Sequence, residues 1–211
     1  MLKFIVAGTG RCGTAYIAQV LTHLGVPCGH EWVYAPEKCY TDIDILGDSS
    51  AQAVPFIPQF DGLVLHQTRD PLKVIGSLVS FKLFDNPQFH GPAGEFIARH
   101  FHMTGNVLED SMRYYVEWNE RCEAARNYFR YRIEDLDFQL LRSIVDRIGV
   151  DVDDRRIVAA LDRVPKNVNT RYSAKALSWR DLPKGRIKND LINISKRYGY
   201  ATEDSAQIHA A

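Results

Sequence analysis

A glycine-rich stretch near the N-terminus has the residue types that bind an anion. It reads Gly8-Thr9-Gly10-Arg11-Cys12-Gly13-Thr14. Where such a loop joins a strand to a helix, its backbone N–H groups and the positive end of the helix dipole point toward one place. One cation in the loop, Arg11, would add its charge there. The residues that we predict to bind the anion are Gly10, Arg11, Cys12, Gly13, Thr14 and Ala15.

The two residues that follow the loop argue against a nucleoside triphosphate with magnesium. Gly8 and Gly13 have the spacing of a nucleotide P-loop, but Thr14-Ala15 stand where that motif has Lys followed by Ser or Thr. An NTPase uses this lysine on the β- and γ-phosphates and the hydroxyl on Mg²⁺. A 5'-phosphosulfate carries less charge at its transferable end and needs no metal, so N–H donors and Arg11 would suffice.

A second basic site lies further along the chain. Arg69 follows an apolar run, residues 62–68, and Ser77 comes eight residues later. The carboxyl end of a parallel strand is where open α/β sheets bind ligands, and an arginine fork with a nearby hydroxyl suits a phosphate group. We therefore expect Arg69 and Ser77 to bind the other end of the same nucleotide.

Strands and helices that alternate along the chain would position these groups. Short apolar runs at residues 2–7, 62–68 and 128–133 predict strands buried on both faces. Helical spacing of apolar residues follows the first two strands, with Gly25 as a C-terminal stop and Asp70-Pro71 as a helix start. A long amphipathic helix is expected at residues 107–126, a mostly helical segment at 138–198, and a substrate-facing loop at 84–105.

This alternation predicts an α/β fold with three layers, in which helices flank a central parallel sheet, as in P-loop proteins. At 211 residues without repeats or linkers, the chain is expected to form a single domain, residues 1–211, with a tail at 201–211 that frays.

Composition and charge limit the classes of partner. Formal net charge is zero, so we expect no nucleic acid partner and an anion bound only at a local site. The apolar run before Gly8 is too short for a signal peptide or a membrane span, and we expect a cytoplasmic location.

Cysteines and histidines indicate neither a disulfide scaffold nor a metal site. The four cysteines have no CxxC spacing and are interpreted as free thiols, including Cys12 within the loop. His90, His100 and His102 lack further ligands at metal-binding spacing, so no metal is predicted.

Taken together, these motifs resemble the sulfotransferases that use 3'-phosphoadenosine-5'-phosphosulfate (PAPS). The glycine loop is similar to the family's 5'-phosphosulfate loop, with Arg11 where many cytosolic members have Lys. The segment from Arg69 to Ser77 is similar to its 3'-phosphate-binding segment, and residues 131–136 resemble its Tyr-Glu-Asp-Leu segment. Trp118-Asn119, residues 177–179 and residues 198–200 add similarity to bacterial members, so that the resemblance spans nearly the whole chain.

Membership would imply transfer of a sulfonate from PAPS to a hydroxyl or amine acceptor by in-line displacement, without a metal. The acceptor's proton needs a base. Glu31 is favoured because several carbohydrate sulfotransferases place a catalytic Glu shortly after the loop helix, and Glu31 precedes aromatic residues here. Cytosolic members use a His, so His30 and His66 stay open.

Two other functions remain open at this point. A nucleotide or nucleoside kinase with an atypical loop would explain the fold and Arg69 but not the missing lysine, and it would depend on magnesium. A non-catalytic nucleotide-binding protein would lack a base near the sulfur.

Small-molecule, lipid and carbohydrate acceptors are all compatible with the sequence, which indicates no oligomeric state. The basic residues between Arg180 and Lys188 are more typical of a solvated helix entrance than of a phosphate clamp.

Overall fold

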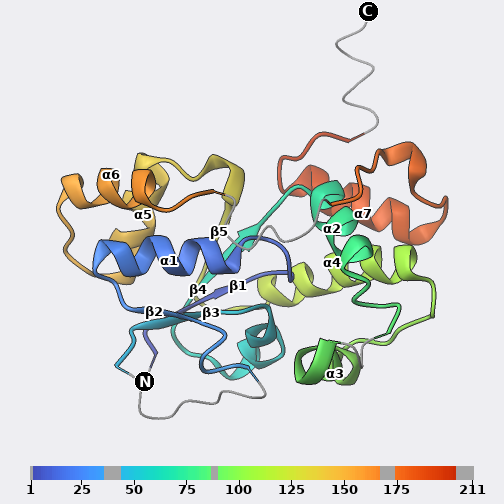
Figure 1. Cartoon of the computed structure of the whole chain (residues 1–211), viewed down its shortest axis with the longest axis horizontal. Coiled ribbons are helices and arrows are strands. Elements are labelled where there is room, and N and C mark those ends of the chain that lie inside the picture. The colour runs from blue at the N-terminus through green and yellow to red at the C-terminus, as the bar shows by residue number, and fades with distance from the viewer. Residues whose placement is uncertain (1, 36–43, 87–89, 167–173, 203–211) are drawn as a thin grey trace, which may run out of the picture.

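A five-stranded, wholly parallel sheet forms the centre of the molecule (Figure 1). In the computed structural model, residues 2–35, 44–86, 90–166 and 174–202 are described. The strand order is β2-β3-β1-β4-β5. Their bounds are β1 Phe4–Ala7, β2 Cys28–His30, β3 Gly47–Ser49, β4 Leu63–Thr68 and β5 Tyr128–Arg132. The predicted α/β fold with a central parallel sheet is thereby confirmed.

Strand β1 shows why its sequence is apolar throughout. Phe4 and Val6 pack into the core on one face of the sheet, whereas Ile5 and Ala7 pack into the core on the other. Successive side chains of a strand point to opposite faces, so a strand covered on both sides needs apolar residues at every position.

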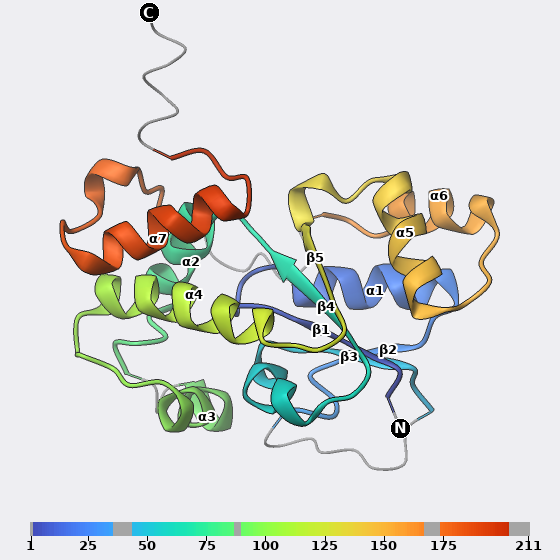
Figure 2. The same ribbon diagram turned by 180° about the vertical axis from the view of Figure 1, so that it is seen from behind.

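Two groups of helices cover the two faces, and Figures 1 and 2 show them gathered on opposite sides of the strands. One group is α1 Thr14–Leu24, α5 Phe138–Ile148 and α6 Asp154–Arg163. The other is α2 Pro71–Phe81, α4 Val107–Glu123 and α7 Arg186–Arg197, together with the 3₁₀ helix η1 Ala51–Gln59. Short 3₁₀ turns lie at Ile133–Asp135 and Trp179–Asp181.

The helix signals read from the sequence occur where expected. Gly25 ends α1 in the left-handed conformation, with φ 87°. Asp70 caps α2 by accepting hydrogen bonds from the N–H groups of Leu72 and Lys73, and Pro71 is the first helical residue. Proline suits this position because the N–H that it lacks would have no partner within the helix.

Three parts of the fold differ from the prediction. The segment expected to be a loop, residues 84–105, contains helix α3, Gly91–His100, which begins with a Gly-Pro pair and buries only Gly94 and Ile97. Its apolar periodicity is therefore weak. Strands β2 and β3 were not predicted because each has only three residues. In the predicted helical segment 138–198, residues 174–178 are not helical. Most of the predicted tail, residues 203–211, lies outside the described residues.

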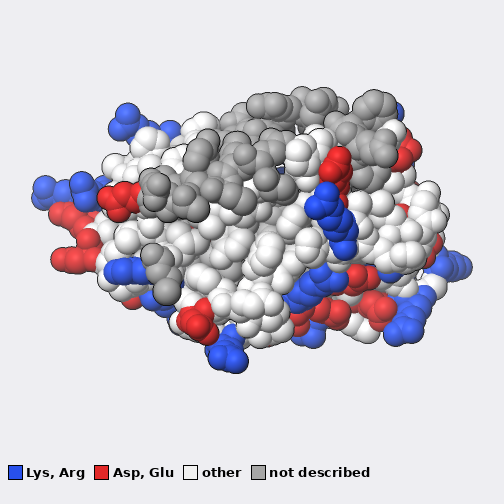
Figure 3. Space-filling model, turned by 90° about the horizontal axis from the view of Figure 1, so that it is seen from below, with Lys and Arg blue, Asp and Glu red and all other residues white. Residues whose placement is uncertain are grey.

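Charge on the surface is mixed, in keeping with the zero formal net charge. On the face in Figure 3, lysine and arginine lie beside aspartate and glutamate around a largely uncharged centre, and neither sign dominates. Among the described residues, no helix combines the length and apolarity that crossing a membrane requires.

Candidate functional site

The glycine loop connects the carboxyl end of β1 to the N-terminus of α1. Arg11 and Gly13 have left-handed backbones, with φ 70° and 97°, and Gly13 caps α1 without a side-chain hydrogen bond. The first N–H groups of a helix have no partner within it, so those of α1 are donors for an anion. Gly8 is required by close packing, since a Cβ there would lie 2.3 Å from the carbonyl oxygen of Gln67 in β4.

Hydrogen bonds to two other elements, α4 and β4, fix the loop in place, and β5 supports the β4 side chain that takes part. The Gly10 N–H donates to the hydroxyl of Tyr114 in α4 (3.1 Å). Gln67 Nε2 in β4 donates to the Cys12 carbonyl oxygen (2.8 Å), and the amide oxygen of Gln67 accepts from the Tyr131 hydroxyl in β5 (2.7 Å). Because Tyr114, Gln67 and Tyr131 are buried, the loop is rigidly supported before any ligand arrives.

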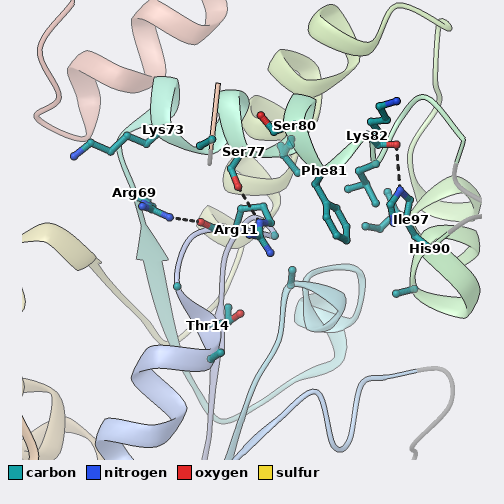
Figure 4. Close-up of a pocket in the computed structure, with 18 of the residues that line it drawn as sticks. Arg11, Thr14, Arg69, Lys73, Ser77, Ser80, Phe81, Lys82, His90 and Ile97 are labelled. Atoms are coloured by element: carbon teal, nitrogen blue, oxygen red, sulfur yellow. Dashed lines mark hydrogen bonds between the residues drawn. The ribbon is translucent and has the colours of Figure 1, made fainter. Parts of the chain in front are cut away.

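Arg11 joins the two segments that the sequence analysis paired. Its Nε donates to Ser77 Oγ in α2 (2.9 Å), and its guanidinium carbon lies 5.3 Å from the centre of the Phe81 ring. Arg69 in turn donates from Nη1 to the Arg11 carbonyl oxygen (2.9 Å). Figure 4 shows Arg69, Arg11 and Ser77 meeting along one wall of a cavity. The predicted juxtaposition of Arg69 and Ser77 with the loop is therefore present in the fold.

The turn that carries Arg69 is held by the segment resembling Tyr-Glu-Asp-Leu. Glu134 accepts a hydrogen bond from the Asp70 N–H (2.8 Å) and another from the Tyr200 hydroxyl (3.2 Å). The Tyr115 hydroxyl donates to the Arg69 carbonyl oxygen (2.9 Å). These contacts tie the end of β4 to the 3₁₀ turn after β5, to α4 and to the segment after α7, and they give Glu134 and Tyr200 a structural role.

A cavity of about 1250 Å³ brings the candidate residues together. Its lining includes five of the six predicted loop residues, both members of the second site, and two of the three proposed bases: Gly10, Arg11, Gly13, Thr14, Ala15, Arg69, Ser77, His30 and Glu31.

The cavity lining also includes three lysines that were not predicted from the sequence: Lys73, Lys82 and Lys175. Lys73 and Lys82 lie in or beside the helix that bears Ser77, but no sequence pattern joins them to the loop. Lys175 reaches the cavity because residues 174–177 cross α2, where its N–H donates to Ser80 Oγ (2.8 Å).

His30 and Glu31 lie at the carboxyl end of β2, on the same edge of the sheet as the loop and Arg69. His30 Nε2 is 3.2 Å from Thr14 Oγ1. Glu31 has a left-handed backbone, with φ 57°, and its N–H donates to the Ser49 carbonyl oxygen. The next turn is anchored by the buried carboxylate of Asp48, which accepts three backbone N–H bonds from Trp32, Val33 and Tyr34.

The structure does not bring His66 to the cavity. This side chain is fully buried, with Nε2 2.7 Å from Asn119 Oδ1 and Nδ1 3.0 Å from the Tyr128 hydroxyl. Asn119 Nδ2 donates to the Tyr115 carbonyl oxygen, so Oδ1 is the acceptor and Nε2 of His66 carries the proton. Burial lowers the pKa of His66 to about 4. His66 is a neutral core residue, and we remove it from the candidate bases.

Cys12 is part of the loop without facing the cavity. Its side chain is fully buried, burial raises the pKa of the thiol to about 12, and its N–H donates to the Thr9 carbonyl oxygen (3.3 Å). A protonated, buried thiol is inert. The predicted contact of Cys12 with an anion is therefore not supported by its side chain or its N–H direction.

The basic residues Lys184, Arg186 and Lys188 lie outside this cavity, whereas His90 is part of its lining. Arg186 forms an ion pair with Asp190 (3.7 Å), and the buried Lys188 Nζ donates to the Trp179 carbonyl oxygen (2.7 Å). Lys184 and Arg186 line a different pocket, between α4 and α7. In the part of the chain that the structure describes, no group of three or more His, Cys, Asp or Glu side chains is arranged to hold a metal ion.

Comparison of the whole chain with known proteins finds similarity in structure but not in sequence. No family model and no curated protein sequence matches the chain. The sulfotransferase domain of an olefin synthase from Synechococcus PCC 7002 superimposes with a TM-score of 0.53 at 15% identity, covering 95% of each chain. Mouse sulfotransferase SULT7A1 in complex with PAP superimposes with a TM-score of 0.48 at 13% identity, covering 98% of this chain and 80% of that one. The chain has the α/β fold of sulfotransferase domains, as the resemblance predicted.

Proposed function

We propose that this chain is a sulfotransferase that transfers a sulfonate group from PAPS to a hydroxyl acceptor. The observation that carries the proposal is the meeting of two predicted phosphate-binding segments in one cavity. Arg11 of the loop is hydrogen bonded to Ser77 of the second segment, and Arg69 is hydrogen bonded to the Arg11 backbone. The sulfotransferase fold supports the same conclusion.

The donors in the cavity suit a nucleotide with phosphates at both ends. The N-terminus of α1, at Thr14 and Ala15, offers N–H groups and the positive end of a helix dipole to the 5'-phosphosulfate. Arg69 and the Ser77 hydroxyl offer a charged fork and a further donor to the 3'-phosphate. Arg11 lies between them, where it adds charge next to the transferring group.

The proposed reaction is a single displacement at sulfur. The acceptor oxygen forms a bond to sulfur as the bond from sulfur to the bridging phosphate oxygen breaks, and the 3',5'-bisphosphate leaves with the electron pair. The acceptor's proton passes to a base, for which we propose Glu31, with His30 beside it on the cavity wall. Arg11 and the α1 N–H groups stabilise the charge that develops on the leaving phosphate.

A thermal-shift comparison tests the donor assignment. Adenosine 3',5'-bisphosphate at about 100 times its dissociation constant should add about 2.7 kcal/mol to the free energy of unfolding. In a domain of this size that raises the melting temperature by about 5 to 11 °C. ADP should stabilise less because it lacks the 3'-phosphate that Arg69 and Ser77 would bind.

ATP with magnesium provides the opposing result. Without the lysine of a P-loop, the chain should gain less stability from ATP and magnesium than from the bisphosphate. Stabilisation by ATP and magnesium with none by the bisphosphate would support the kinase alternative and refute the proposal. Binding of the bisphosphate without release of it from PAPS, over a broad acceptor panel, would support the non-catalytic alternative.

A further inference from the structure

The cavity is larger than a site for one ligand, and its two ends differ in chemistry. Its volume of about 1250 Å³ exceeds the roughly 300 to 1,000 Å³ typical of a single small-molecule pocket. Figure 4 shows Arg69 and Lys73 toward one end, Phe81, Ile97 and His90 toward the other, and Arg11 between them. We call the second part the apolar end; its wall is formed by Phe81, Leu83, Ala93 and Ile97.

We propose that the apolar end binds the acceptor, and that the acceptor is a hydroxyl group on an apolar alkyl or aryl skeleton rather than on a sugar. The proposal rests on the proposed function, since it takes the basic end as the nucleotide site. It selects one of the acceptor classes that the sequence left open.

The wall of the apolar end comes from α2, the turn after it and α3, and it is backed by aromatic packing. Leu83 and Ile97 expose only 6% and 8% of their surfaces and belong to the packed core. Behind this wall, the rings of Phe96 and His100 of α3 lie 4.3 Å apart, and Phe96 lies 6.0 Å from Phe56 of η1. Helix α3 is thus fixed against η1, and the wall is preformed for an apolar ligand.

Among the described residues, few polar groups are available to a ligand at the apolar end. His90 Nε2 is 3.2 Å from the Lys82 carbonyl oxygen, and the centres of the Phe81 and His90 rings lie 4.4 Å apart. The Lys82 ammonium group points away from Phe81 in Figure 4. A sugar bound here would leave several hydroxyls without partners after they lose their water, which is unfavourable for each one.

Calorimetric titrations on protein saturated with adenosine 3',5'-bisphosphate test the acceptor class. The probes are 1-butanol, 1-hexanol and 1-octanol as a homologous series, 2-naphthol, and methyl glucoside. Each methylene added within the alcohol series should tighten binding by about fourfold until the apolar end is filled. Methyl glucoside should bind at least about tenfold more weakly than 2-naphthol, because its hydroxyls find few partners.

Two matched variants on α3 locate the site. Ala93→Asp places a carboxylate in the apolar end, whereas Ala98→Asp places one on the same helix, at a partly exposed position outside the cavity lining. Ala93→Asp should weaken 2-naphthol binding by about tenfold or more while the bisphosphate affinity stays within about twofold. Ala98→Asp should leave both affinities unchanged.

The outcomes separate this proposal from the proposed function. Tight binding of methyl glucoside, no binding of any alcohol, or equal effects of the two variants would overturn the acceptor class while the nucleotide assignment stands. If the wild-type protein does not bind adenosine 3',5'-bisphosphate before any alcohol is added, both proposals are overturned.

Discussion

Replacement of Arg69 by alanine should sharply reduce discrimination between nucleotides with and without a 3'-phosphate. Arg69 lines the cavity at the end of β4, and one of its guanidinium nitrogens is bonded to the Arg11 carbonyl oxygen. A hydrogen bond to a charged group contributes about 1.5 to 3 kcal/mol. Loss of one or more such bonds to the 3'-phosphate should weaken binding of adenosine 3',5'-bisphosphate by about 10- to 150-fold.

Adenosine 5'-monophosphate separates this role from support of the loop. Arg69→Ala also removes the bond to the Arg11 carbonyl, which weakens binding of both nucleotides by the same factor if the loop shifts. Only the ratio of the two dissociation constants reports contact with the 3'-phosphate. Arg69→Lys keeps the charge without the fork, so it should restore only part of the ratio.

Isothermal titration calorimetry of wild type and both variants measures the two dissociation constants, with thermal unfolding as a check of folding. A folded Arg69→Ala variant whose affinity falls equally for both nucleotides would refute a phosphate contact and leave Arg69 a purely structural residue. An unchanged ratio with unchanged affinities would place the 3'-phosphate elsewhere.

Two further predictions concern Arg11 and His66. Arg11→Ala should reduce the turnover of PAPS by about 10²- to 10³-fold, because it removes a donor to the developing charge. Arg11→Lys should recover part of the rate, and near-normal turnover of folded Arg11→Ala would exclude the assigned role. Burial lowers the pKa of His66 to about 4 from 6.5, so the unfolded chain binds more protons between these values and stability falls as pH decreases. Between pH 7 and 5 this loss should be about 2 kcal/mol in urea unfolding, and His66→Gln should lack it; an unchanged pH dependence in that variant would refute the assignment.

Local signals in the sequence were sufficient to predict those parts of the fold whose conformation depends on a few neighbouring residues. The apolar run of β1, the glycine that ends α1 and the Asp-Pro pair that begins α2 each act within a few residues, and the structure has them as predicted. Helix α3 escaped prediction because it buries little. The three-residue strands β2 and β3 escaped it because they depend on pairing with other strands, β3 with β1 and β2 with β3.

Residues distant in sequence decided the candidate bases. The sequence left His30, Glu31 and His66 open as candidate bases, with Glu31 favoured. The fold separates them, since β2 ends at the cavity, whereas His66 points from β4 into the core toward Asn119 of α4. The apolar residues of β4 indicate that the strand is buried, but they do not show that Asn119 of α4 and Tyr128 of β5 bond to the ring of His66.

The glycine loop itself shows both contributions. Its sequence predicted that a helix N-terminus and Arg11 meet at one place, as an anion site requires, and the absence of the P-loop lysine argued against a triphosphate with magnesium. Only the tertiary structure placed Ser77 next to Arg11, tied Gly10 to Tyr114 and brought Lys175 to the cavity. The two hydrogen bonds, from Arg11 to Ser77 and from Gly10 to Tyr114, join residues that are 66 and 104 positions apart in the sequence. The spacing of residues along the chain determines the conformation of a single loop, whereas the packing of parallel strands determines which loops meet at the edge of the sheet.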